Sequence, residues 1–192
     1  MMIKRITSAL VLIAASFTMQ AQGTYKMDPA HSKLGFTITH LGIADVPGHF
    51  DKFDVVVKTT KKDFSDAVVE MNADVNTINT RIAPRDKHLR SADFFDVEKY
   101  PSMTFKSNAI RKIAENKYEL SGELTMRGIT KPVKINMWHR GSIQKKEGEK
   151  LTAGLQFTAT IKRSDFNLGS KFPAPMLSDE VTLKGDGEFL QQ

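Results

Sequence analysis

The feature that most constrains this chain is a period of two in its apolar residues. In the clearest run, residues 151–162, every odd position is apolar and the even positions are polar or Gly. Such alternation gives a β-strand one apolar face and one wet face. The sequence therefore predicts eight strands, one for each run of this kind. The other seven runs are 34–38, 53–57, 69–75, 103–109, 118–126, 133–137 and 181–189.

The alternation also selects the type of sheet. Antiparallel sheets with one face toward water show it, whereas parallel sheets are buried on both faces and do not. Turn residues join several runs, as at Glu115-Asn116 and Arg127-Gly128. No long helical pattern separates the strands, so we expect an all-β fold, either a sandwich or a closed barrel.

Two features favour the barrel. Several runs span about ten residues, as steeply tilted barrel strands require. Small residues recur on the inward face, where they are expected to leave room inside, at Gly122, Ala153, Ala159, Gly185 and Gly187. We predict an eight-stranded antiparallel barrel, which is wide enough for one small ligand. An outer-membrane barrel is the alternative, but three Tyr and one Trp are too few for two aromatic girdles.

The N-terminus predicts export. Lys4 and Arg5 precede an apolar run over residues 6–17, and Ala21 is a small residue before the expected cleavage. The run is too short to span a bilayer comfortably, although a retained anchor helix is the alternative. We assign residues 1–21 to a signal peptide and residues 22–192 to one domain, periplasmic or secreted. The chain has no Cys, which excludes disulfides and lipid attachment through Cys.

The charge limits the partners. The formal net charge is +6, and Lys4 and Arg5 account for two of these charges. The rest is spread out, without a basic stripe carrying interleaved aromatic residues, so nucleic-acid binding is not predicted. Weak attraction to an anionic membrane surface is compatible with this charge. Trp138 falls on the wet face of its strand, which marks either a homodimer surface or a lone surface Trp.

Two irregular segments interrupt the alternation. Residues 85–97 combine a charged cluster with Phe94-Phe95, and Pro84 fits the first turn of a short helix. This segment forms either the rim of an apolar cavity or a loop that caps the core. Residues 172–179 form a long apolar loop stiffened by Pro, which acts either as a lid over an open barrel end or as a plug.

Seven motifs, in order along nearly the whole chain after residue 21, resemble those of the YceI-like family of periplasmic polyisoprenoid-binding proteins. Where the family pattern usually has Gly after Asp165-Phe166, this chain has Asn167, which tolerates positive φ. The motifs are Asp28-x-x-His31-Ser32, Phe36-x-x-x-His40, Gly48-x-Phe50, Arg85-Asp86-x-His88-Leu89-x-Ser91-x-Asp93-Phe94-Phe95-Asp96, Tyr100-Pro101-x-x-x-Phe105, Gly122-x-Leu124-Thr125-x-Arg127-Gly128-x-Thr130-x-Pro132-Val133 and Arg163-x-Asp165-Phe166.

The resemblance implies a lipocalin-like barrel whose apolar pore holds an isoprenoid chain or another long-chain lipid, such as a fatty-acid amide. Such a ligand needs a deep apolar tube and a polar anchor at its mouth. The predicted tube residues are Phe36, Ile38, Phe53, Val55, Phe105, Leu120, Leu124, Leu155, Phe157 and Ala159. The predicted mouth and lid residues are His40, Arg85, Asp86, His88, Phe94, Phe95, Phe166 and Phe172.

Other classes of function have weaker support. The histidines do not form a His-x-x-x-His zinc signature, and there is neither a Gly-x-Ser-x-Gly nucleophile turn nor a Cys-x-x-Cys-His haem motif. We predict a binding protein without catalytic residues, metal or cofactor. A metal- or haem-binding protein, or a hydrolase that uses the mouth histidines, is the alternative. A filled barrel without a ligand is another.

Overall fold

Residues 23–192, which this computed structural model describes, form ten β-strands, one α-helix and two short 3-10 helices. The predicted signal peptide, residues 1–21, lies outside the described residues. The strands are β1 (Gly23–His40), β2 (Ala44–Phe50), β3 (Phe53–Thr59), β4 (Val68–Asp74), β5 (Ile78–Asn79), β6 (Ser102–Ala114), β7 (Lys117–Met126), β8 (Ile129–Gln144), β9 (Leu151–Lys162) and β10 (Leu177–Gln191). The helices are η1 (Val75–Thr77), α1 (Ala83–Arg90) and η2 (Arg163–Phe166).

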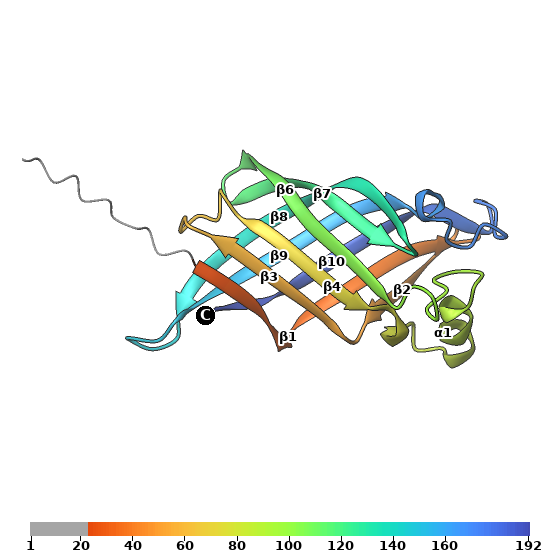
Figure 1. Cartoon of the computed structure of the whole chain (residues 1–192), viewed down its shortest axis with the longest axis horizontal. Coiled ribbons are helices and arrows are strands. Elements are labelled where there is room, and N and C mark those ends of the chain that lie inside the picture. The colour runs from red at the N-terminus through yellow and green to blue at the C-terminus, as the bar shows by residue number, and fades with distance from the viewer. Residues whose placement is uncertain (1–22) are drawn as a thin grey trace, which may run out of the picture.

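The strands form one closed antiparallel barrel (Figure 1). The sheet runs β10-β9-β8-β7-β6-β4-β3-β1, and β10 pairs with β1 to close it. Strands β2 and β3 share one place in the wall, because β1 pairs with β3 near its start and with β2 near its end. Likewise β4 pairs with β3 and β5 pairs with β2. The prediction of an eight-stranded antiparallel barrel is confirmed.

Strand β1 is longer and less regular than the alternation predicts. It begins at Gly23, and it bulges between Met27, which pairs with Phe189, and Ser32, which pairs with Gly187. On its other side, β1 pairs with β3 as far as Lys26 and with β2 only from Leu34 onward. Within the described residues, the stretch 27–33 therefore has no strand partner on the β2–β3 side.

The small inward residues do not all leave room. A Cβ added to Gly122 would lie 2.6 Å from the ring of Phe105, and one added to Gly187 would lie 2.1 Å from the Ser32 hydroxyl oxygen. Neighbouring side chains already fill these two places. The prediction of free space is wrong there, because alternation shows which residues point inward but not what their neighbours occupy.

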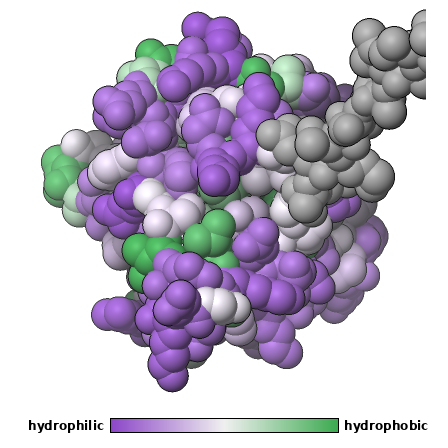
Figure 2. Space-filling view, turned by 90° about the vertical axis from the view of Figure 1, so that its left-hand side faces the viewer, coloured by the Kyte–Doolittle hydropathy of each residue, from purple (hydrophilic) through white to green (hydrophobic). Residues whose placement is uncertain are grey.

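A plug closes one end of the barrel. The loop between β3 and β4 inserts Phe64, which is 1% exposed, with its ring centre 5.0 Å from Tyr25 and 4.5 Å from His139. Nearby, Tyr118 donates a hydrogen bond to the carbonyl of Asp63. Burial raises the pKa of Asp66 in the same loop, but hydrogen bonds from Thr59 and Thr60 outweigh it and lower that pKa to about 2. Figure 2 shows that hydrophilic residues cover most of this end.

The remaining surface is mixed. Trp138 lies on the outer face of β8 as predicted, with Lys117 and Arg140 over its ring. Its role as a dimer contact stays a prediction. No helix within residues 23–192 has the length and apolar character needed to cross a membrane.

Candidate binding cavity

The end of the barrel opposite the plug opens into an apolar cavity of about 350 Å³. A narrower space of about 70 Å³ continues from it toward the middle of the barrel. The two spaces are adjacent, because they share the lining residues Phe50, Met103, Ile161 and Leu183. The inner space is lined almost wholly by apolar side chains, whereas polar side chains gather at the mouth.

Most of the predicted site residues line these spaces. In the larger cavity they are Phe36, Ile38, His40, Arg85, His88, Phe94, Phe95 and Phe172. In the inner space they are Phe53, Val55, Phe105, Leu124, Phe157 and Ala159.

Four predicted residues, Asp86, Leu120, Leu155 and Phe166, line neither space. Leu120 and Leu155 point inward with 0% exposure, but they pack in the filled part of the barrel. Phe166 belongs to the same buried core. The period of two gives the direction of a side chain and not its depth along the barrel axis. Ligand contact by the other fourteen residues stays a prediction.

Helix α1 is anchored through Thr80, a buried residue that the sequence did not single out. Its N–H and hydroxyl donate to Asp86 Oδ1 at 2.8 and 2.5 Å. Arg85 donates from Nε to the Thr80 hydroxyl at 2.7 Å and from Nη2 to the Thr80 carbonyl at 2.9 Å. Asp86 is therefore part of a structural closure. Arg85 anchors α1 and also lines the cavity, and its contact with a polar head group stays a prediction.

The two adjacent phenylalanines after α1 diverge. Phe94 stacks on Phe172 of the lid loop with ring centres 5.2 Å apart, and His88 meets both rings edge-on. Phe95 instead meets Phe50 of the barrel edge-on at 6.1 Å. This aromatic cluster forms one wall of the cavity and couples the lid loop to α1.

Arg163 holds the lid loop in place. The sequence placed this loop at residues 172–179, but it spans residues 168–177, because η2 ends at Phe166 and β10 already begins at Leu177. The Arg163 side chain is 6% exposed, and its five N–H groups donate to backbone carbonyls around the loop. The next turn contains Asn167 at φ 54° and ψ 32°, so the left-handed conformation expected there is confirmed. The acceptors of Arg163 are the carbonyls of Leu168, Gly169, Phe172, Leu177 and Ser178.

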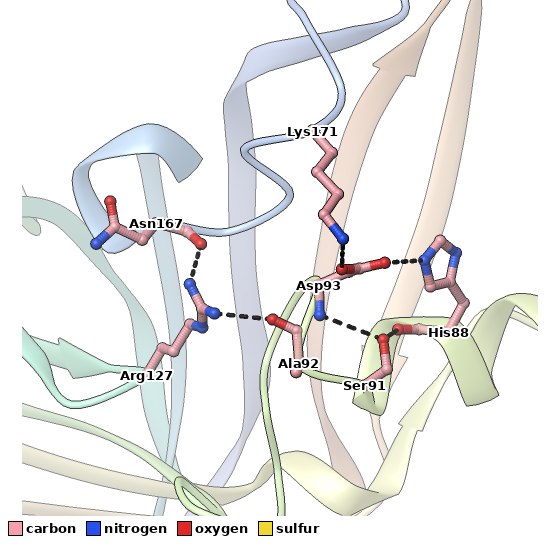
Figure 3. Close-up of polar contacts among 7 residues, drawn as sticks. All are labelled: His88, Ser91, Ala92, Asp93, Arg127, Asn167 and Lys171. Atoms are coloured by element: carbon pink, nitrogen blue, oxygen red, sulfur yellow. Dashed lines mark hydrogen bonds and ion pairs between the residues drawn. The ribbon is translucent and has the colours of Figure 1, made fainter.

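A second set of polar contacts connects the lid loop to the segment after α1 (Figure 3). Asp93 accepts from Lys171 Nζ at 2.7 Å and lies 3.3 Å from His88 Nε2. The hydrogen bonds from Lys171 and His88 lower the pKa of Asp93. Arg127 donates to the carbonyls of Asn167 and Ala92. The sequence placed Arg127 in a hairpin turn, with no sign of this bridging role.

Comparison with known proteins identifies the family. The model of the YceI-like domain matches residues 25–189. The chain belongs to the YceI-like family. Its relatives include UPF0312 proteins of Pectobacterium carotovorum, 36% identical over 85% of this chain and 84% of the relative, and of Pseudomonas aeruginosa, 36% identical over the full length of both chains.

Solved structures show the same fold as this YceI-like protein. BcnA of Burkholderia cenocepacia has a TM-score of 0.74 at 27% identity, covering 86% of this chain and 99% of BcnA. The YCEI protein of Campylobacter jejuni has a TM-score of 0.74 at 30% identity, covering 81% of this chain and 90% of that protein. A polyisoprenoid binding domain from Saccharophagus degradans has a TM-score of 0.61 at 16% identity, covering 88% and 98%. This last likeness concerns the fold alone.

The positions of the histidines test the alternative that this YceI-like protein binds a metal. Within residues 23–192, one group of three metal-capable side chains occurs, in which Asp28, His31 and Glu188 bring ligand atoms within 4.8 Å. It lies at the β1 bulge, and none of its residues lines the 350 Å³ cavity. His40 and His88 line the cavity, but His139 lies at the plug. His40 and His88 therefore share the cavity, whereas His31 and His139 lie elsewhere, so the four histidines do not converge on one site.

Proposed function

We propose that this YceI-like protein is an exported, non-enzymatic binding protein that holds a long-chain amphiphilic lipid, an isoprenoid or a fatty-acid derivative. The observation that carries the proposal is the shape and chemistry of the cavity. It is apolar along its depth, open at one end and plugged at the other by Phe64. Such a space suits a chain that enters tail first and leaves its polar head at the mouth.

The mouth supplies donors for a head group. Arg85 uses Nε and Nη2 for Thr80, and no partner of its Nη1 occurs within the described residues. His40 and His88 line the same opening. A phosphate or carbonyl oxygen is the natural acceptor for such donors. Because the free lipid resides in a bilayer as apolar as the cavity, shape and this head contact decide specificity.

The comparisons support the class of ligand. The domain of Saccharophagus degradans with the same fold is described as polyisoprenoid binding. At 16% identity, that likeness does not specify the chain length or the head group for this protein. The predicted carriage or storage of the lipid outside the cytoplasm rests on the signal peptide of residues 1–21.

Native mass spectrometry of protein purified without detergent tests the proposal. We expect a bound mass in the lipid range, whereas a metal or haem mass would favour the alternative class.

Ala159→Trp should reduce lipid occupancy, because Ala159 lines the inner space and the indole fills it. Overpacking costs about 1–3 kcal/mol, so a melting curve accompanies the measurement. The control is Thr160→Trp, one residue along on the exposed face. Unchanged lipid content in folded Ala159→Trp would contradict the proposed site.

Export is tested on the same material. We expect the intact mass to correspond to a chain that begins at about Gln22, recovered from the soluble exported fraction. An uncleaved N-terminus embedded in the inner membrane would refute this part of the proposal.

A further inference from the structure

The open end of the barrel carries large apolar side chains that point into solvent. Ile43 is 86% exposed, Leu41 is 53% exposed and Ile82 is 51% exposed. Leu41 and Ile43 form the hairpin between β1 and β2, and Ile82 immediately precedes α1. The hairpin, α1 and the lid loop lie together at this end (Figure 1). Single exposed apolar residues are common, but three around one opening form a feature that requires an explanation.

The lid loop continues this apolar rim. Met176 is 45% exposed, and its carbonyl accepts a hydrogen bond from the Leu41 N–H at 2.9 Å. Met176 also lines the cavity. Met176 therefore borders the entrance to the cavity. Leu41 is hydrogen-bonded to it, and Ile82 lies in sequence between the lining residues Thr80 and Arg85. We call Leu41, Ile43, Ile82 and Met176 the apolar rim.

The cations beside the apolar rim lack acidic partners. Residues 81–90 contain Arg81, Arg85, Lys87 and Arg90 against one acid, Asp86, so their formal charge is 4 − 1 = +3. Asp86 is buried and engaged by Thr80. Within residues 23–192, none of the four cations forms an ion pair, whereas cations on the barrel wall do. Residues 81–90 thus carry positive charge that no acid of residues 23–192 pairs. Asp93 and Asp96, which follow in the chain, pair instead with Lys171 and Lys99.

We propose that this end docks on the surface of an anionic lipid bilayer. The apolar rim enters the boundary between head groups and acyl chains, and the cations of residues 81–90 contact the phosphates. Interfacial binding by proteins combines these two components, buried apolar area and attraction to anionic lipid. Docking in this orientation places the cavity entrance against the bilayer.

The observations favour a bilayer over a protein partner. The apolar rim comes from three separate segments around an opening, so it presents points for insertion and not one continuous face. The cations of residues 81–90, none of which forms an ion pair within residues 23–192, complement a lipid surface of uniform negative charge. The inference uses the position of the cavity and not its occupant, so it can fail independently of the proposed function.

Sedimentation with lipid vesicles tests the inference on the purified protein. We expect binding to vesicles of equal parts phosphatidylglycerol and phosphatidylcholine, weak binding to pure phosphatidylcholine, and a loss of binding at about 1 M salt, where charges are screened. Ile43→Asp should weaken binding about tenfold or more, because it removes an inserted side chain and adds a negative charge. Lys87→Glu should weaken binding to the anionic vesicles about fivefold or more and barely change binding to the neutral ones.

The matched control is Ile143→Asp. Ile143 is 60% exposed and lies near the end of β8, at the plugged end of the barrel. This variant makes the same chemical change outside the apolar rim, so its vesicle binding should equal that of the unaltered protein. The inference would be overturned if Ile43→Asp and Ile143→Asp lost vesicle binding equally, or if the unaltered protein did not sediment with vesicles. The apolar rim would then be a contact site for another protein. Native mass spectrometry of Ile43→Asp measures lipid occupancy of the cavity, so a loss of vesicle binding can be distinguished from a loss of the bound lipid.

Discussion

The two ends of the barrel are built by different physical means. At the plug, Phe64 fills the space and packs on aromatic neighbours, so closure depends on buried apolar contact. At the mouth, the lid loop is held by the hydrogen bonds of Arg163, and a cavity of about 350 Å³ remains beneath it. Packing tolerates little adjustment, whereas a loop held by hydrogen bonds can shift without losing a core. The plug therefore supplies stability, and the mouth supplies a place for binding.

The largest expected effect concerns the plug. Phe64→Ala should lower the free energy of unfolding by about 3–5 kcal/mol, because it removes a buried aromatic ring and leaves a cavity. Chemical denaturation measures this value. The comparison variant is Phe172→Ala at the mouth, where the ring is partly exposed and the loss should be below about 2 kcal/mol. Equal losses in the two variants would remove the distinction between the ends.

Arg163→Met should have the next largest effect, about 2–3 kcal/mol, because five carbonyls lose a charged donor. Hydrogen exchange should accelerate in residues 168–177 and remain slow in residues 60–67 of the plug. Lys171→Met, in the same loop, breaks one exposed ion pair with Asp93 and should cost less than about 1 kcal/mol. Faster exchange at the plug would show that the two ends are coupled.

The third prediction concerns the mouth alone. Arg85→Ala should weaken a lipid with a polar head about tenfold, since a charged hydrogen bond is worth roughly 1.5–3 kcal/mol. A headless hydrocarbon of equal length should be barely affected. Phe95→Ala should weaken both ligands alike, because it removes only apolar contact. The control is Arg90→Ala, on the same helix but outside the cavity lining.

If Arg85→Ala weakens both ligands equally and lowers the melting temperature sharply, its contacts with Thr80 are its main role. The polar head must then be bound elsewhere at the mouth.

The smallest effect is a dependence on pH at the plug. Burial lowers the pKa of His139, so the ring stays neutral in the folded protein while the unfolded chain takes up a proton near its ordinary pKa of 6.5. Above pH 6.5, His139 does not make the free energy of unfolding depend on pH. As the pH falls below 6.5, the unfolded chain binds a proton that the folded protein does not, so stability is lost. One proton gives a slope of at most about 1.4 kcal/mol per pH unit. Melting between about pH 7 and 5.5 should be less pH-dependent in His139→Gln, and an unchanged slope would contradict this origin.

The sequence predicted the parts of the fold that depend on local pattern. Alternation located the eight strand places, and Pro84 located the start of α1. Alternation could not tell which inward residues line the cavity. Leu124 lines the inner space and Leu120 does not, although both have the same parity on β7. The roles of Thr80 and Arg127 depend on partners 5 to 40 residues away, and local sequence carries no sign of those partners.

The unpaired stretch of β1 has a mechanical consequence. Residues 27–33 lie between the part of β1 that pairs with β3 and the part that pairs with β2. Over this stretch one seam of the cylinder has no interstrand ladder, so widening it breaks the fewest backbone hydrogen bonds. Separating β1 from β2 and β3 over residues 27–33 therefore breaks no interstrand backbone hydrogen bond on that side, whereas nearer the mouth β1 stays paired with β2 from Leu34 to His40.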